Sequence, residues 1–242
     1  MSHDVERKCK FMFNRGVSFF YSDKLWRLVP KQIDELDSSL QKTLSQSFRP
    51  ESGPWYWLRF MTDTSPGIVV LVASLFVLWL IAGHEPRKES KQRRFKIGLY
   101  HLGLFGVFIG ASDLFVNQGL KVAIGRLKPY VNAVVPGLNQ ALSFPSSHAF
   151  NSAVWATLVV LLHKHYCTLG HRQRWVPILA MFICFVFGSS RIFLGEHYPL
   201  DVLGGWCFGT LFGRMAFPLF LRLSQKGIVL CGTSSTDRLA TY

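Results

Sequence analysis

The sequence predicts an all-α fold: a polytopic bundle of membrane-spanning helices with an amphipathic, interfacial helical segment at its N-terminus. Three observations predict it. Hydrophobic residues make up 49% of the 242 residues, and the mean hydropathy is +0.23. Long apolar stretches recur along the chain, and basic residues cluster in alternate loops between them. Five such stretches within roughly 160 residues leave too few polar helix faces for a soluble domain.

Five stretches approach the length of about 20 apolar residues that a helix needs to cross a bilayer. They cover residues 65–82, 97–120, 149–163, 175–189 and 199–223. The third and fourth are the shortest. A soluble protein with five buried helices is the alternative interpretation. The sequence therefore predicts a membrane domain at 65–223, followed by a C-terminal tail at 224–242.

Residues 1–64 are predicted to form a separate helical segment at the membrane interface. Apolar residues recur there at helical spacing, at Ile33, Leu36, Leu40 and Leu44. This spacing predicts an amphipathic helix over residues 33–48. The aromatic residues at 55–57 are typical of a membrane interface. The alternative is a degenerate sixth span at residues 11–30, which would place the N-terminus in the cytoplasm.

The net charge of +13 can indicate nucleic acid, anionic lipid or an anionic substrate as partner. The loops 83–96 and 164–174 are rich in Lys and Arg, so the positive-inside rule places both in the cytoplasm. Alternation then places the loops 121–148 and 190–198 on the opposite face, which is the periplasm for a bacterial inner membrane. Because topology accounts for the basic charge, we expect a lipid bilayer as partner and no nucleic acid.

Polar residues of complementary chemistry gather at the outer ends of three predicted spans. They lie in KVAIGRLKP, FPSSHAF and SSRIFLGEHYPLD, and comprise Lys121, Arg126, Lys128, Ser146, Ser147, His148, Arg191, His197 and Asp201. The charge argument places all three segments on the same side of the membrane. Cations and helix N-termini bind phosphate oxygens well. The three segments together therefore predict a phosphate site.

Two histidines and one carboxylate supply the reactive groups of this site. If the last span already includes His197, Asp201 lies one turn further on the same face and can accept the proton of one imidazole nitrogen. The other nitrogen can attack phosphorus and form a phospho-histidine. His148 can donate a proton to the leaving oxygen and later accept one from water. Ser146 is placed to cap the third span, and the cations stabilise charge on the phosphoryl oxygens.

Fixed positive charge takes the place of a metal ion in this mechanism. A metal site built from His148, Glu196 and His197 is the alternative. The neighbouring cations would repel a divalent ion. We therefore expect no metal and no cofactor.

The three segments resemble the signature of the type 2 phosphatidic acid phosphatase superfamily, K-x6-R-P, then P-S-G-H, then S-R-x5-H-x3-D. The resemblance covers residues 60–223. It implies a helical membrane bundle that hydrolyses lipid phosphates or diphosphates without metal, at a site facing the periplasm, cell exterior or organelle lumen. By position, it implies phosphate binding by Lys121, Lys128, Ser146, Ser147 and Arg191, with His148 as acid and His197 as nucleophile oriented by Asp201.

Two positions depart from the family signature. Lys128 stands where the pattern has Arg, and lysine cannot make a planar bidentate contact with an oxyanion. We expect Arg126, two residues earlier, to compensate in part by binding phosphate. Ser147 stands where the pattern has Gly, so its side chain either crowds the phosphate or adds a donor. The nucleophile and acid positions are intact, so we expect an active enzyme.

Further polar and small residues lie inside the predicted spans. Asp113, Asn117 and Lys121 are four residues apart on one face of the second span. An intramembrane Asp usually has a partner or a role, and we expect Asp113 to position Lys121 or Arg191. Small residues in the last span predict a close helix contact; they are Gly204, Gly205, Gly209 and Gly213.

The expected function is hydrolysis of a lipid-linked phosphate or diphosphate. Substrates of the family include lipid A, undecaprenyl diphosphate, phosphatidate and phosphatidylglycerol phosphate. Only 15 residues separate Pro129 from Pro145, which favours a lipid headgroup over a bulky soluble substrate, with lipid A or a polyprenyl diphosphate preferred. Two alternatives stay open: a lipid phosphotransferase that uses the same phospho-histidine, and a non-enzymatic anion-binding membrane protein.

Overall fold

The computed structural model of the chain describes residues 25–46, 91–129, 142–166 and 175–232. Within these residues the regular secondary structure is entirely helical. An isolated antiparallel β-bridge joins Leu127 to Leu142. The predicted all-α class is therefore confirmed for the described part of the chain.

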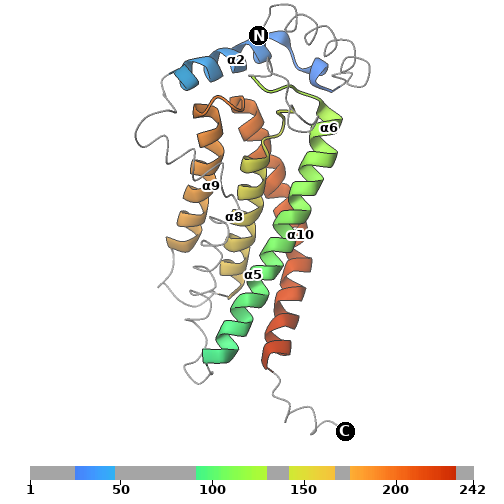
Figure 1. The fold of residues 1–242 in the computed structure, drawn as a ribbon, viewed down its shortest axis with the longest axis vertical. Helices are drawn as coiled ribbons and strands as arrows, with labels where there is room; N and C mark the ends of the chain where they lie inside the picture. The colour runs from blue at the N-terminus through green and yellow to red at the C-terminus, as the bar shows by residue number, and fades with distance from the viewer. Residues whose placement is uncertain (1–24, 47–90, 130–141, 167–174, 233–242) are drawn as a thin grey trace, which may run out of the picture.

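Four long helices form a bundle, and a shorter helix lies across one end of it (Figure 1). The long helices are α5 (Lys91–Leu114), α8 (Ser147–Tyr166), α9 (Trp175–Phe193) and α10 (Pro199–Gly232). α5 continues without a break through a π-helical segment, η2 (Phe115–Leu120), into α6 (Lys121–Ile124). The crossing helix is α2 (Lys31–Gln46), which follows a short 3₁₀ turn, η1 (Trp26–Leu28).

The described helices coincide with the predicted spans at 97–120, 149–163, 175–189 and 199–223, and α10 continues further, to Gly232. Among the helices that the structure describes, two are long and apolar enough to cross a membrane, Phe95–Ile124 and Trp175–Phe193. The predicted first span and the alternative span at 11–30 lie outside the described residues. The total of five or six spans therefore stays a prediction.

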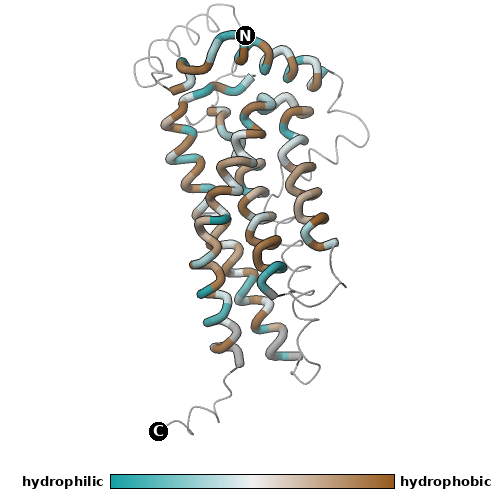
Figure 2. The backbone as a smooth tube through the Cα atoms, turned by 180° about the vertical axis from the view of Figure 1, so that it is seen from behind, coloured by the Kyte–Doolittle hydropathy of each residue, from teal (hydrophilic) through white to brown (hydrophobic). Residues whose placement is uncertain are grey.

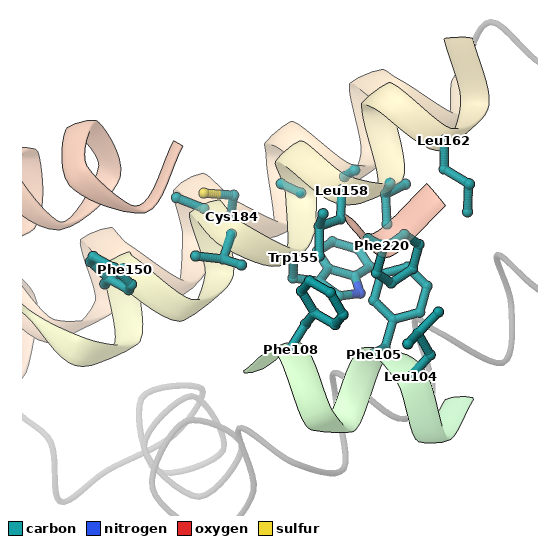
Figure 3. Close-up of a cluster of buried hydrophobic side chains, with 14 of the residues drawn as sticks. Leu104, Phe105, Phe108, Phe150, Trp155, Leu158, Leu162, Cys184 and Phe220 are labelled. Carbon is teal, nitrogen blue, oxygen red and sulfur yellow. The ribbon is translucent and has the colours of Figure 1, made fainter. Parts of the chain in front are cut away.

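The core of the bundle is built around α8, which contacts α5, α9 and α10. Aromatic side chains from three helices meet there: Phe105 and Phe108 of α5, Trp155 of α8 and Phe220 of α10 (Figure 3). The ring centroids of Phe105 and Phe220 are 4.8 Å apart, and those of Phe108 and Phe220 are 5.2 Å apart in an edge-on arrangement. Such aromatic pairs stabilise the fold by more than the apolar area that they bury would give.

The outer surface of the bundle also carries large apolar side chains. Apolar segments recur along the full length of the long helices (Figure 2). Exposed apolar residues include Leu99, Val107, Leu114, Ile178, Met181, Phe182, Phe185, Leu211, Met215 and Leu219. A water-soluble protein rarely exposes apolar residues in this number on adjoining helices, whereas lipid tails accommodate them. The surface is therefore that of a bundle embedded in lipid.

Glycines allow α10 to lie directly against α8. A Cβ atom added at Gly205 would stand 2.8 Å from the carbonyl oxygen of Ser146, and one at Gly209 would overlap the carbonyl oxygen of Phe150. At Gly213 the nearest atom, the Cβ of Thr157, would be 2.9 Å away. The predicted close contact of the last span is confirmed, and its partner is α8.

This contact gives the first testable prediction. We expect Gly209→Ala to destabilise the protein by about 1–3 kcal/mol, because the added methyl group meets backbone that cannot rotate away. The measurement is the midpoint of thermal unfolding in detergent. Gly110→Ala on α5 is the matched control, since nothing lies within 4 Å of a Cβ atom there. A midpoint for Gly209→Ala equal to that of the control would contradict the prediction.

Candidate active site

The three polar segments meet at the end of the bundle that α2 covers (Figure 1). Two backbone hydrogen bonds join them. The N–H group of Ser143 donates to the carbonyl of Arg126 at 2.6 Å, and that of Ser146 donates to the carbonyl of Asp201 at 3.0 Å. The ends of α6, α8 and α10 are thereby held together, as the sequence predicts for a shared site.

Gly125 directs the chain from α6 into this end of the bundle. It follows the last helical residue, has a φ of 74°, and donates its N–H group to the carbonyl of Lys121 at 2.9 Å. A left-handed residue at this position is the usual way to end a helix, and glycine adopts it without steric cost. The segment that carries Arg126 and Lys128 therefore turns back toward the bundle.

His197 is buried, with 2% of its surface exposed, and its Nδ1 atom faces two oxygens. Nδ1 lies 3.2 Å from Oγ of Ser143 and 3.5 Å from Oδ2 of Asp201. The hydroxyl of Ser143 donates to Oδ2 of Asp201, so its oxygen can accept the Nδ1 proton. Ser143 thus bridges the imidazole and the carboxylate. This tautomer leaves Nε2 with a lone pair.

Asp201 is fully buried and lies in the first turn of α10. That helix begins at Pro199, the expected first position, and therefore does not include His197. The imidazole and the carboxylate nevertheless lie close, because Oδ2 of Asp201 accepts the N–H group of Tyr198 at 2.9 Å. A carboxylate that reaches back to the residue before the helix is the reciprocal half of a capping box.

Burial holds the pKa of His197 well below its ordinary value of 6.5, at about 4. The charge of Asp201 acts in the opposite sense, whereas the cations Lys128 and Lys121 lower this pKa further. The imidazole is therefore neutral at neutral pH. A neutral imidazole with a free Nε2 lone pair is a competent nucleophile.

The cations of the family signature lie around this imidazole. Lys121 is buried, with 5% of its surface exposed, and the charges of Lys128, Arg191 and Asp201 all act on its ammonium group. Arg191 is equally buried and forms an ion pair with the carboxylate of Glu196. The structure thus brings Lys121, Lys128 and Arg191 together near the His197–Asp201 pair, as the spacing predicts.

The FPSSHAF segment forms the start of α8. Ser146 precedes the helix, and its carbonyl accepts the N–H group of Phe150 at 2.9 Å. It therefore occupies the predicted capping position, but its buried Oγ makes no hydrogen bond within the described residues. The hydroxyl of Ser147 turns away and donates to Oδ1 of Asn117 at 2.9 Å. His148 lies in the first turn and is partly buried.

Within the described residues, Asp113 binds Asn151 of α8 and forms no hydrogen bond or ion pair with Lys121 or Arg191. Its Oδ1 atom accepts the side-chain amide of Asn151 at 2.8 Å, and Oδ1 of Asn151 accepts the hydroxyl of Ser112 at 2.8 Å. The negative charge of Asp113 still attracts the ammonium group of Lys121. Asp113 therefore supports the site through the α5–α8 contact.

Arg126 lies elsewhere than the sequence predicts. Instead of facing the phosphate site with the other cations, its guanidinium contacts three carboxylates. Nη1 lies 2.8 Å from Asp201 and 2.8 Å from Asp37, and Nη2 lies 2.8 Å from Asp34. Asp34 and Asp37 belong to α2, which the sequence does not connect with the site. The prediction that Arg126 binds phosphate is not retained, because its terminal nitrogens are already engaged.

A family of known proteins matches the part of the chain that carries most of this site. Residues 101–225, more than half of the chain, match the family model described as the PAP2 superfamily. The chain belongs to the PAP2 superfamily. The predicted resemblance is thereby confirmed, and with it the assignment as a membrane lipid phosphatase.

Curated relatives and a solved structure agree with this assignment. The PAP2 chain is 36% identical over 159 residues to phosphatidylglycerophosphatase B of Bacillus subtilis strain 168, covering 65% of this chain and 72% of the relative. It is 23% identical over 180 residues to a lipid A 4'-phosphatase of Bacteroides thetaiotaomicron, covering 71% and 73%. The crystal structure of a transmembrane PAP2 type phosphatidylglycerolphosphate phosphatase from Bacillus subtilis superposes with a TM-score of 0.53 and 26% identity, covering 83% of this chain and 90% of the other.

The environment of His197 gives a testable prediction about protonation. Its pKa in the folded protein is below that of an unfolded chain, so between about pH 4 and 6.5 the unfolded state binds a proton that the folded state does not. The free energy of unfolding therefore decreases as the pH falls through that window. In a histidine NMR titration in detergent micelles, the resonance absent from His197→Gln should show a midpoint well below 6.5. A midpoint at 6.5 or above would contradict the prediction.

Proposed function

We propose that this PAP2 protein removes a phosphoryl group from a membrane lipid through a covalent phospho-histidine on His197. The observation that carries the proposal is the buried, neutral imidazole of His197. Its Nδ1 faces Ser143 and Asp201, and cations act on it from the other segments. An imidazole held in this way presents Nε2 as the attacking atom.

In the first step, Nε2 of His197 attacks phosphorus in line with the ester oxygen. A P–N bond forms and the P–O bond to the lipid breaks, while protonated His148 gives its proton to the leaving oxygen. The imidazole becomes positively charged as the bond forms. Asp201, acting directly and through Ser143, stabilises that charge.

The proposed phosphate ligands are the signature residues Lys121, Lys128, Ser146 and Arg191. The buried Oγ of Ser146 has no hydrogen-bond partner within the described residues, although buried polar atoms are normally paired. A phosphoryl oxygen would supply that partner. Arg191 would exchange its ion pair with Glu196 for a bidentate contact with phosphate. Ser147, bonded to Asn117, would act by fixing the start of α8.

In the second step, water attacks the phospho-histidine. His148, now neutral, accepts a proton from the water, the P–N bond breaks, and inorganic phosphate leaves. His197 returns to its neutral form. The cations around the site balance the charge of the phosphoryl oxygens in both steps.

We propose phosphatidylglycerol phosphate as the first substrate to test. The relative at 36% identity and the superposed crystal structure are both named for that lipid. Lipid A and undecaprenyl diphosphate, which the short outer loop favours, are the alternatives. All of these lipids present a terminal phosphate at the membrane surface, which is the group that the cations would bind.

We also propose that the site faces the periplasm. The opposite end of the bundle carries the start of α5 and the end of α8, where Lys96 and Lys164 lie (Figure 1). Basic residues at the ends of spans mark the cytoplasmic side.

The proposed function is tested by phosphate release in detergent from a panel of these lipids, with a chelator present. We expect His197→Ala to abolish release, because no nucleophile remains. His148→Ala should lower the rate by about 10²–10⁴, as expected for loss of a general acid. His165→Ala, an exposed histidine at the far end of α8, is the control and should retain full activity.

Enzyme treated with lipid radiolabelled in its phosphate and quenched in alkaline detergent should carry an acid-labile, base-stable phosphate in the wild type and none in His197→Ala. Retained turnover in His197→Ala would end the proposed mechanism. Transfer of label to an added alcohol in place of water would identify a phosphotransferase.

The bridging position of Ser143 gives a further prediction. Ser143→Ala should lower kcat by about 10-fold with KM little changed, because Nδ1 loses its nearest acceptor while the phosphate ligands remain. The control is Ser152→Ala, a buried α8 serine that bonds the carbonyl of Ala149. Equal kcat values for both variants would show that the bridge has no role.

A further inference from the structure

Arg126 is the centre of a buried ion cluster behind the His197–Asp201 pair. Its side chain is 3% exposed, and those of Asp37 and Asp201 are 2% and 0% exposed. Nη1 lies 2.8 Å from an oxygen of each. A buried cation must be paired to be tolerated, and here one carboxylate comes from α2 and the other from α10.

Two aromatic rings fix the plane of the Arg126 guanidinium. Its central carbon lies 4.0 Å from the ring centroid of Trp26 and 3.8 Å from that of Tyr198. Stacking on two faces leaves the group no freedom to rotate toward substrate. The planar fork can therefore hold its carboxylates in one orientation.

Asp37 also acts on α10 directly. Its Oδ1 atom accepts the N–H group of Leu200 at 2.9 Å, across 163 residues of sequence. Leu200 is the second residue of α10, where backbone N–H groups have no partner inside the helix. A carboxylate at a helix N-terminus is stabilising and fixes its first turn. Asp37 thus holds the turn that carries Asp201.

The polar face of α2 also covers the loop before α10. Gln41 is buried, and a Cβ atom at Gly195 would lie 3.5 Å from its Nε2 atom. Gly195 has a φ of 74° and precedes Glu196 and His197. The helix therefore packs on the loop that presents the imidazole.

We propose that Arg126 and Asp37 are positioning residues for phosphoryl transfer, and that α2 belongs to the active site because it supplies Asp37. Arg126 engages Oδ1 of Asp201, so that Oδ2 is the oxygen that faces Ser143 and His197. Asp37 holds both Arg126 and the first turn of α10. α2 precedes the residues that match the family. This inference rests on the proposed role of His197.

The test compares kcat and KM of full-length variants in detergent, with phosphatidylglycerol phosphate or the fastest substrate of the panel. Arg126→Lys and Asp37→Asn should each lower kcat by about 10–100-fold, the range for groups that orient a catalytic imidazole. KM should stay within about twofold, because neither residue touches phosphate. Glu35→Gln removes the same charge from an exposed position of α2 and should leave kcat unchanged.

A positioning role also predicts that the two changes are coupled. Asp37→Asn should have little further effect in the Arg126→Lys background, because the carboxylate acts through the guanidinium. Multiplied losses in the double variant would overturn the inference. So would an unchanged kcat in Asp37→Asn, an isosteric change whose fold is checked by its unfolding midpoint. A raised KM with normal kcat in Arg126→Lys would return this residue to phosphate binding.

These outcomes are distinct from failure of the proposed function. If His197→Ala is inactive while Arg126→Lys and Asp37→Asn behave as wild type, the phospho-histidine mechanism stands and the positioning inference fails. If His197→Ala is active, both fail.

Discussion

The site depends on how the structure accommodates one fully buried carboxylate. Asp201 has no exposed surface, and an ionised carboxylate in such a place is tolerated only when its oxygens are paired. Arg126 pairs with Oδ1, while the hydroxyl of Ser143 and the N–H group of Tyr198 bind Oδ2. The groups that pair with the two carboxylate oxygens also fix the orientation of the Asp201 side chain. Because Oδ2 of Asp201 faces Nδ1 of His197, the orientation of the carboxylate sets that of the imidazole.

The packing that stabilises the bundle also sets this geometry. The N–H group of Ser146 reaches the carbonyl of Asp201 only because α8 and α10 lie in direct contact at Gly205. A side chain there would stand 2.8 Å from the Ser146 carbonyl and would force the two helix ends apart. Fold and site therefore share one constraint: small residues on α10 hold the start of α8, with Ser146 and His148, against the turn that carries Asp201.

The sequence predicts local chemistry well and distant partners poorly. Spacing within a segment identifies the contact between His197 and Asp201, and hydropathy identifies the long helices, because both depend on residues near in sequence. Arg126 is assigned to phosphate because it stands beside Lys128, yet its partners lie on α2. Asp37 meets Leu200 across 163 residues, and nothing in the local pattern of either predicts that contact.

The burial pattern of α2 explains why its role is hidden in the sequence. Its apolar spacing predicts a helix at the membrane interface, and the apolar residues Ile33, Leu36 and Leu40 are indeed 45%, 62% and 46% exposed. The buried residues of the helix are polar, Asp37 and Gln41. In water this arrangement would be unfavourable, because apolar groups would face solvent. Beside lipid it is consistent: the apolar face is available to the bilayer interface, while the polar face satisfies the charges of the site.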